Sequence, residues 1–224
     1  MLIIICVVAL MGVLFYFSWS ISLGVYLRSV CCNRSKKGCV ALTFDDGVDE
    51  ELTPKLLKLL DKYNAKATFF IIGEKARKHP HVVELIHRRG HAIGNHSMYH
   101  RGSFPMQSSG ALYNEIMECS TVIESIIGER VRYFRPPFGV TNPMVGSAVR
   151  RSGLCSVGWS IRSFDTMGHP VEVVERRVVK QIKGGDIVLM HDNRECVIEL
   201  TVRVLRYLER NSYRAVSVDE LLKT

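Results

Sequence analysis

An α/β fold is the class that this sequence predicts: a distorted (β/α) barrel of about seven strand–helix units, preceded by an N-terminal transmembrane helix. Short apolar runs alternate with segments of helical periodicity from residue 39 onward, and repeated units of this kind form parallel sheets with right-handed crossovers. Polar motifs directly follow several of the apolar runs, as active-site residues do at the carboxyl ends of barrel strands. An uncharged stretch at the start predicts the membrane helix.

Residues 1–27 contain no charged side chain and begin with the apolar run MLIIICVVALMGVLFYF. A stretch of about 20 apolar residues is long enough to span a bilayer. A cleaved secretory signal is the alternative, but such signals have a basic amino-terminal region and a shorter apolar core. We therefore expect a transmembrane anchor or signal segment over 1–27, a basic linker over 28–38 and one folded domain over 39–224.

The charge and the cysteines narrow the range of partners. The formal charge is +8 and the pI is near 9.2, and basic chains can bind nucleic acid. No basic run is interleaved with aromatic residues, so we expect no nucleic-acid partner. Two explanations of the positive charge remain. The chain could bind an anionic cell wall or lipid surface, or its basic surface could simply be solvated without a partner.

The 7 cysteines include no C-x-x-C pair, which argues against a cysteine zinc site. We expect free thiols, and no obligate protein partner is indicated.

Strands and helices are expected to alternate through the domain. Each expected strand is a short apolar run: 39–44, 67–72, 91–95, 131–134, 154–159, 186–190 and 214–216. Each expected helix shows helical periodicity: 52–63, 81–89, 110–127, 143–151, 171–182 and 196–209. In the last helix, apolar residues recur at spacings of three and four and would bury one face: Val197, Leu200, Val204, Leu205 and Leu208.

Two adjacent carboxylates, Asp45 and Asp46, end the first expected strand in the run TFDDG. Asp-Asp-Gly is also a common turn sequence, so the motif alone does not establish chemistry. Adjacent residues that leave a strand point in opposite directions. The pair can therefore divide two tasks, with one carboxylate binding a metal and the other facing the water that it activates.

A His-x-x-x-His pair follows the expected strand at 91–95. A lone histidine is more often structural than a ligand, but His96 and His100 lie on one face if the segment turns helically. The strand delivers them to the same rim as Asp46. One carboxylate and two imidazoles leave positions open for water and substrate, as in catalytic zinc sites. Other divalent ions suit these ligands too, so we expect a divalent metal, with Zn²⁺ as the first candidate.

Two more motifs follow later strands. The run RPPFG begins with Arg135, and its prolines stiffen the loop that leaves the strand. The run DIVLMHD contains a strand that ends at His191. Either motif alone is adequately explained as structural. Combined with the two carboxylates and the histidine pair, they supply the components of a metal-dependent hydrolase.

In this order the motifs resemble the polysaccharide deacetylase family, also called carbohydrate esterase family four, from about residue 39 to the C-terminus. The resemblance implies that 39–224 is a catalytic domain. It also implies that Asp45 is the general base and that Asp46, His96 and His100 are the metal ligands.

The resemblance implies roles for the two later motifs as well. Arg135 would orient the base carboxylate, and the backbone N–H of Phe138 would help to hold an oxyanion. His191 would be the general acid that protonates the leaving amine. Leu189 would line a small pocket for the acetyl methyl group.

A further motif, the fourth in chain order, departs from the family. Many relatives carry a pattern of the type W-D-x-D-x-x-D-W, whereas this chain reads WSIRSFDT over 159–166. Trp159 and the last acid, Asp165, are kept, and we expect Trp159 to contact substrate. Asp165 is expected to pair with the motif arginine or to tune the late histidine. Arg162 and Thr166 replace an aspartate and a tryptophan, and in the family that tryptophan ring usually shapes one side of the substrate groove.

The expected function is a metal-dependent deacetylase that hydrolyses the N-acetyl group of GlcNAc-containing glycans, of peptidoglycan or chitin type, and releases acetate. The same chemistry on a membrane glycolipid, including deformylation, is an alternative. A catalytically silent module that binds glycan is another. We expect attachment to a membrane through the N-terminal segment and an extracytoplasmic catalytic domain, where glycans lie. The basic residues that follow the segment oppose this orientation under the positive-inside rule: Arg28, Arg34, Lys36 and Lys37.

Overall fold

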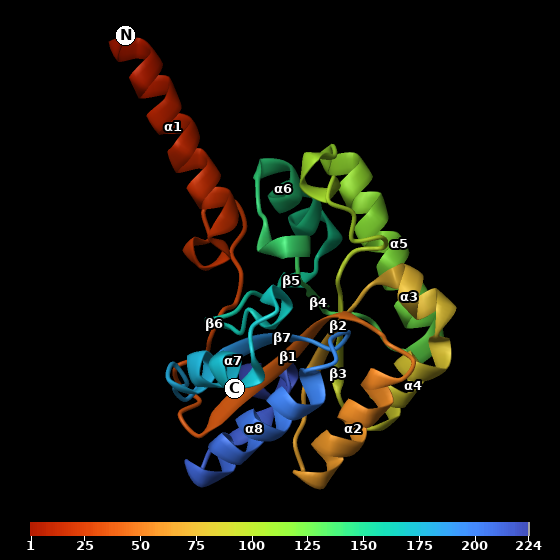
Figure 1. Cartoon of the computed structure of the whole chain (residues 1–224). Helices are drawn as coiled ribbons and strands as arrows, with labels where there is room; N and C mark the ends of the chain where they lie inside the picture. Colours follow the sequence, from red (N-terminus) through yellow and green to blue (C-terminus); the bar gives the residue numbers. More distant parts are fainter. Residues whose placement is uncertain (224) are drawn as a thin grey trace.

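Parallel strands form a curved sheet, and helices cover its outer face (Figure 1). The computed structural model describes residues 1–223; Thr224, the last residue of the expected domain, lies outside the described residues. Strands and helices alternate from residue 39 onward, as the sequence predicts. The strands are β1 (Cys39–Gly47), β2 (Thr68–Ile71), β3 (Ala92–Asn95), β4 (Tyr133–Phe134), β5 (Cys155–Ser156), β6 (Ile161–Arg162), β7 (Ile187–His191) and β8 (Arg214–Val216).

Several helices have capping residues at their ends. Ser108, Asn142 and Ser217 each accept a hydrogen bond from a backbone N–H of the first turn, which satisfies donors that a helix leaves free. Gly128 and Gly153 end two helices in the left-handed conformation. The α-helices are α1 (Leu2–Trp19), α2 (Leu52–Lys62), α3 (Gly73–Lys78), α4 (Pro80–Arg88), α5 (Ser109–Ile127), α6 (Pro143–Ser152), α7 (Val171–Val179), α8 (Val197–Arg210) and α9 (Val218–Leu222), and the 3₁₀ helices are η1 (Ile21–Leu23), η2 (Phe104–Met106), η3 (Pro137–Gly139) and η4 (Asp165–Met167).

The strand order confirms the distorted barrel. Among the described residues the strands follow one another as β5-β4-β3-β2-β1-β7-β6, and β8 pairs with the start of β1. All of these pairings are parallel. The strands β5 and β6 lie at the two ends of the path, so the sheet forms part of a barrel. Because the strands are parallel, their carboxyl ends meet at one rim.

Alternate residues of β1 face opposite sides of the sheet, as strand geometry requires. Val40, Leu42 and Phe44 join the large apolar core that also includes residues of α2, α4, α7 and α8. Thr43 and Asp45 face the other side, where the Arg135 guanidinium contacts both. The apolar face expected on the last long helix is confirmed, since five residues of α8 are buried: Val197, Leu200, Val204, Leu205 and Leu208.

One strand and two α-helices of the domain were not expected from the sequence. The strand β6 has 2 residues, and the helices α3 and α9 have 6 and 5. Segments this short offer too few apolar repeats for a periodicity to be visible. In α3 (GEKARK), only Gly73 and Ala76 are buried, so tertiary contacts rather than an apolar stripe fix the helix.

The N-terminal helix α1 extends away from the barrel (Figure 1). It has 18 residues, from Leu2 to Trp19. In the part of the chain that the structure describes, no helix has both the length and the apolar character for a membrane crossing. The transmembrane helix expected over 1–27 is thus not found; α1 ends at Trp19, and Ile21 and Leu27 are buried.

The segment expected as a basic linker, 28–38, lies against the barrel. Val30 forms a bridge with Val157 after β5, and Cys32 forms one with Asp186 before β7. Arg34 adds an ion pair to Asp186, with 2.8 Å between Nη2 and Oδ1. Residues 30–32 thus reach from one end of the strand path toward the other.

Replacing Gly185 by alanine tests this packing. Its φ is +84°, and a Cβ there would overlap the carbonyl of Asn33. A left-handed L-residue costs roughly 1–2 kcal/mol and overpacking roughly 1–3 kcal/mol, so Gly185→Ala should lower the free energy of unfolding by about 2–5 kcal/mol in urea titrations. Gly128→Ala is the matched control, because Gly128 has a similar φ of +72° and open space around it. Equal losses in the two variants would contradict the packing of Asn33 against Gly185.

Candidate active site

The end of β1 carries the two adjacent carboxylates. The register of β1 and β7 pairs Asp45 with His191, so these side chains come from neighbouring positions on adjacent strands. Asp45 is only 3% exposed. Asp46 has a positive φ of 68°, and it lies where the pairing of β1 with β2 is irregular, between Phe44 and Gly47. The two carboxylates consequently have different neighbours: Asp45 contacts Arg135, and Asp46 contacts two histidines.

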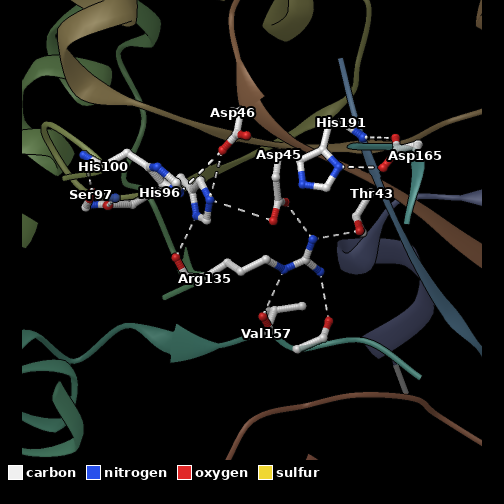
Figure 2. A network of polar contacts seen from close by, with 12 residues as sticks. Thr43, Asp45, Asp46, His96, Ser97, His100, Arg135, Val157, Asp165 and His191 are labelled. Carbon is white, nitrogen blue, oxygen red and sulfur yellow. Dashed lines mark hydrogen bonds and ion pairs between the residues drawn. The ribbon is translucent and has the colours of Figure 1, made fainter. Parts of the chain in front are cut away.

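Asp46, His96 and His100 come together as the sequence predicts (Figure 2). Both histidine Nε2 atoms lie 3.4 Å from Oδ1 of Asp46. One ligand atom from each residue lies within 4.8 Å of the other two. His96 follows β3 directly, and His100 lies in the loop after it with a φ of 49°. These residues form the ligand cluster.

The chemistry of the ligand cluster fits a divalent cation. The ring Nδ1 of His96 is 2.8 Å from the carbonyl oxygen of Arg135, which fixes the ring and leaves Nε2 for a metal. Burial, followed by the charge of His96, lowers the pKa of His100 to about 4, so its imidazole is a neutral ligand near pH 7. Burial alone would raise the pKa of Asp46, but the hydrogen bond and charge of His96 and the charge of His100 hold it well below its usual range.

Arg135 anchors the Asp45 carboxylate from below (Figure 2). It is fully buried, and its Nη1 donates to Oδ1 of Asp45 at 2.7 Å and to Oγ1 of Thr43 at 2.8 Å. Its Nε and Nη2 donate to the carbonyl oxygens of Val157 and Gly158, at 3.1 and 2.8 Å. Burial lowers the pKa of the guanidinium, while the charge of Asp45 opposes that change. A buried cation with this many partners holds Asp45 in one orientation.

Asp165 holds His191 on the other side of the cavity. The ring Nδ1 of His191 lies 2.7 Å from Oδ1 of Asp165, and its backbone N–H donates to Oδ2 at 2.8 Å. Burial alone would lower the pKa of His191, but this hydrogen bond and the nearby carboxylate charges raise it above its ordinary value. Asp165 was expected to pair with Arg135 or to tune His191, and in the structure its partner is His191.

One cavity of about 190 Å³ is lined by Asp45, His191 and the ligand cluster, whereas Arg135 and Asp165 are not among its lining residues. Phe138, with a φ of 61° in η3, places its ring 4.6 Å from the ring of His100, centroid to centroid. Leu189 precedes the end of β7 and is 2% exposed. Trp159 covers the far wall, where a Cβ on Gly139 would collide with its ring. Lining the same cavity are Asp45, Asp46, His96, His100, Phe138, Gly139, Trp159, Arg162, Thr166, Leu189, His191 and Arg194.

Sequence reasoning missed several of these participants. Arg194 follows the late histidine by three positions and has no motif to mark it. Thr43 lies in an apolar strand, where its hydroxyl contact with the arginine is visible only once the strands are paired. The RPPFG motif predicts a stiff loop but does not indicate that the missing side chain of Gly139 makes room for the Trp159 ring.

Residues 33–157 match the family model described as polysaccharide deacetylase. The chain is 38% identical over 189 residues to a peptidoglycan-N-acetylglucosamine deacetylase of Bacillus cereus, a match that covers 82% of this chain and 88% of the relative.

The chain belongs to the polysaccharide deacetylase family. The resemblance expected from the four motifs is thereby confirmed over most of the domain.

Solved structures agree with this membership. A peptidoglycan N-acetylglucosamine deacetylase in complex with 4-naphthalen-1-yl-N-oxidanyl-benzamide matches with a TM-score of 0.80 and 28% identity, over 88% of this chain and 93% of that chain. A family pseudoenzyme from Bacillus anthracis matches with a TM-score of 0.81 and 26% identity, over 87% of this chain and 69% of that chain. This fold therefore occurs both in a deacetylase and in a pseudoenzyme of the family.

Proposed function

We propose that this deacetylase uses a divalent metal to hydrolyse the N-acetyl group of GlcNAc-containing glycans, of peptidoglycan or chitin type, and releases acetate. The observation that carries the proposal is the meeting of Asp45, His191 and the ligand cluster at one cavity. The similarity to a peptidoglycan-N-acetylglucosamine deacetylase supports the substrate class.

The metal site consists of Asp46, His96 and His100. A divalent ion held there would polarise the acetyl carbonyl and lower the pKa of a water molecule. Asp45 accepts the proton of the attacking water as general base. Its Oδ1 is fixed by Arg135, whereas its Oδ2 lies on the side of the ligand cluster, 3.8 Å from Nε2 of His96.

Residues of β7 and of the neighbouring loops act on the leaving nitrogen and on the acetyl group. His191 is the general acid that protonates the departing nitrogen, because Asp165 engages Nδ1 and leaves Nε2 for the substrate. The oxyanion receives a hydrogen bond from the backbone N–H of Phe138. Leu189 packs against the acetyl methyl group, and Trp159 forms a wall for the sugar.

Replacing Asp165 by asparagine should shift the pH dependence of turnover. A general acid must be protonated, so kcat falls as pH rises through the pKa of His191. The carboxylate of Asp165 raises that pKa, and its loss should move the descending limb of the kcat–pH profile to lower pH. We also expect kcat to fall by roughly tenfold or more at neutral pH, because the acid loses its orientation.

The matched control for this change is Asp219→Asn, since Asp219 pairs with Arg132 at the surface. An unshifted descending limb in Asp165→Asn, with the fold intact, would mean that His191 is not the acid that the profile reports.

Acetate release from a panel of N-acetylated glycans, with and without chelator, tests the function directly. Release that depends on a metal supports it. Tight glycan binding without acetate release would favour a silent module of the kind represented by the pseudoenzyme. Release of acetate or formate only from a lipid-linked sugar would favour the glycolipid alternative.

We further propose that α1 attaches the enzyme to a lipid surface on the extracytoplasmic side. In support, the apolar side chains of α1 are largely exposed, including Ile4 at 68% and Phe15 at 66%, and exposed apolar surface of this extent favours a lipid partner. Membrane fractionation of the full chain, with Val8→Asp/Phe15→Asp as the detaching variant and Arg176→Gln as the control, checks attachment. Protease accessibility of the domain in intact cells checks the side, and complete protection would contradict it.

A further inference from the structure

Two arginines line the catalytic cavity without a carboxylate partner. Arg162 and Arg194 both border it, yet within residues 1–223 neither makes an ion pair with an Asp or Glu side chain. The other cationic group at this site, Arg135, is held by Asp45 and by backbone carbonyls. The site carboxylates Asp45, Asp46 and Asp165 therefore already have cationic or imidazole partners. The guanidinium groups of Arg162 and Arg194 have no such partner.

Strand geometry aims Arg162 into the cavity. It is the second residue of β6 and pairs in register with Leu189 of β7, which also lines the cavity. The preceding residue, Ile161, is 2% exposed and joins the core beneath the helices. Because successive residues of a strand face opposite sides, Arg162 faces the barrel rim.

Aromatic rings hold the Arg162 guanidinium in place. The Cζ atom of Arg162 lies 5.6 Å from the ring centroid of Trp159 and 5.0 Å from that of Phe164. The carbon of a second guanidinium, Arg177, lies 5.1 Å from the same Phe164 ring. A guanidinium stacked in this way keeps its in-plane N–H groups for hydrogen bonds. Arg162 is thus a pre-positioned donor rather than a freely moving surface side chain.

We propose that Arg162 and Arg194 bind an anionic group of the substrate, so that this enzyme prefers acetamido sugars that carry a carboxylate or a phosphate close to the reacting N-acetyl group. The inference rests on the proposed function and narrows its substrate class. A planar fork of donors matches carboxylate and phosphate oxygens. A neutral glycan would leave both guanidinium groups in the cavity without a counter-ion. The departure of the fourth motif at Arg162 agrees with this, because a cation stands where many relatives have an aspartate.

Matched pairs of substrates test the preference with the metal-loaded full chain. The first pair is a glycan fragment with lactyl-ether carboxylates and the same fragment with those carboxylates converted to amides. The second pair is N-acetylglucosamine 1-phosphate and the corresponding methyl glycoside. The ratio of kcat/KM for the anionic and neutral members, and the ratio of their Kd values by calorimetry, are the readouts. The two pairs distinguish a carboxylate from a phosphate as the natural anion.

We expect the wild type to prefer one anionic member by roughly tenfold to a hundredfold, the range of a charge-assisted hydrogen bond, and less at high salt. Arg162→Gln should reduce that ratio by about tenfold or more, and Arg162→Lys should retain part of it. Arg176→Gln, an exposed change of equal charge on α7, should leave the ratio unchanged. If Arg162→Gln does not fold, the exposed Arg194 provides the same test as Arg194→Gln.

Ratios near one for both pairs in the wild type, or ratios that neither arginine variant changes, overturn the inference. Absence of turnover on every substrate, together with tighter anion binding that depends on Arg162, would instead reject the proposed function and leave the anion site standing.

Discussion

Replacing Asp45 by asparagine is expected to lower kcat by about 10²–10⁴-fold, the usual contribution of a general base, while the protein keeps its metal. Asparagine has nearly the same shape, and its amide oxygen can still accept from Nη1 of Arg135, which holds the carboxylate at 2.7 Å. The substitution thus removes the basic oxygen but keeps the contact. Acetate release and metal content, measured on the same preparation, check both parts of the expectation.

The adjacent carboxylate is the matched comparison. Asp46→Asn should weaken metal binding, because Oδ1 of Asp46 lies 3.4 Å from both imidazoles of the ligand cluster. If Asp45→Asn emptied the site while Asp46→Asn kept the metal, the roles of the two carboxylates would be reversed. Urea unfolding of both variants separates a loss of chemistry from a loss of fold.

The parts of the site that lie at strand ends could be predicted because parallel strands impose a common rim. Asp45 and His191 are far apart in the sequence, yet each ends an apolar run, and the register of β1 and β7 then pairs them. The same logic links Asn95 of β3 to Phe134 of β4. The next residues, His96 and Arg135, consequently meet through the ring Nδ1 of one and the carbonyl of the other.

What escaped prediction depends on contacts that no local pattern encodes. The guanidinium of Arg135 is fixed by the backbone carbonyls of Val157 and Gly158, and any residue type provides such a carbonyl. Arg194 reaches the cavity from a loop without periodicity. The placement of 28–38 against the barrel rests on bridges to residues more than a hundred positions away. Its basic, polar composition resembles that of a linker, although Asn33 donates to the carbonyl oxygen of Leu221 and Arg34 pairs with Asp186.

The N-terminal stretch illustrates a strong local pattern whose residues divide between two environments. An uncharged run of 27 residues predicts one long helix, but α1 ends at Trp19. Ile21 and Leu27 are buried in the domain at 4% and 5% exposure. Their apolar character thus serves the core of the domain, and composition alone does not distinguish that use from insertion into lipid.

Removal of the metal is expected to abolish activity, and this is the second large effect. A chelated and dialysed preparation should release no acetate above background, and addition of Zn²⁺ or another divalent ion should restore release. The ligand cluster places three donors within 4.8 Å of one another, and among the described residues it is the one group of this kind. Metal bound only to the folded state also adds stability, by about 2.7 kcal/mol at a free concentration 100 times Kd, so the melting temperature should fall with chelation.

Ligand variants make this result specific to the cluster. His100→Ala should lose the metal with little damage to the core, because its side chain is 16% exposed, whereas that of His96 is 3% exposed and supports the fold as well. His191→Ala is the control: it should lose turnover but keep the metal and the metal-dependent rise in melting temperature, since His191 pairs with Asp165 instead. Full activity after verified removal of the metal would refute the assignment of Asp46, His96 and His100. Loss of the metal in His191→Ala would show that the acid and the ligands are not separate groups.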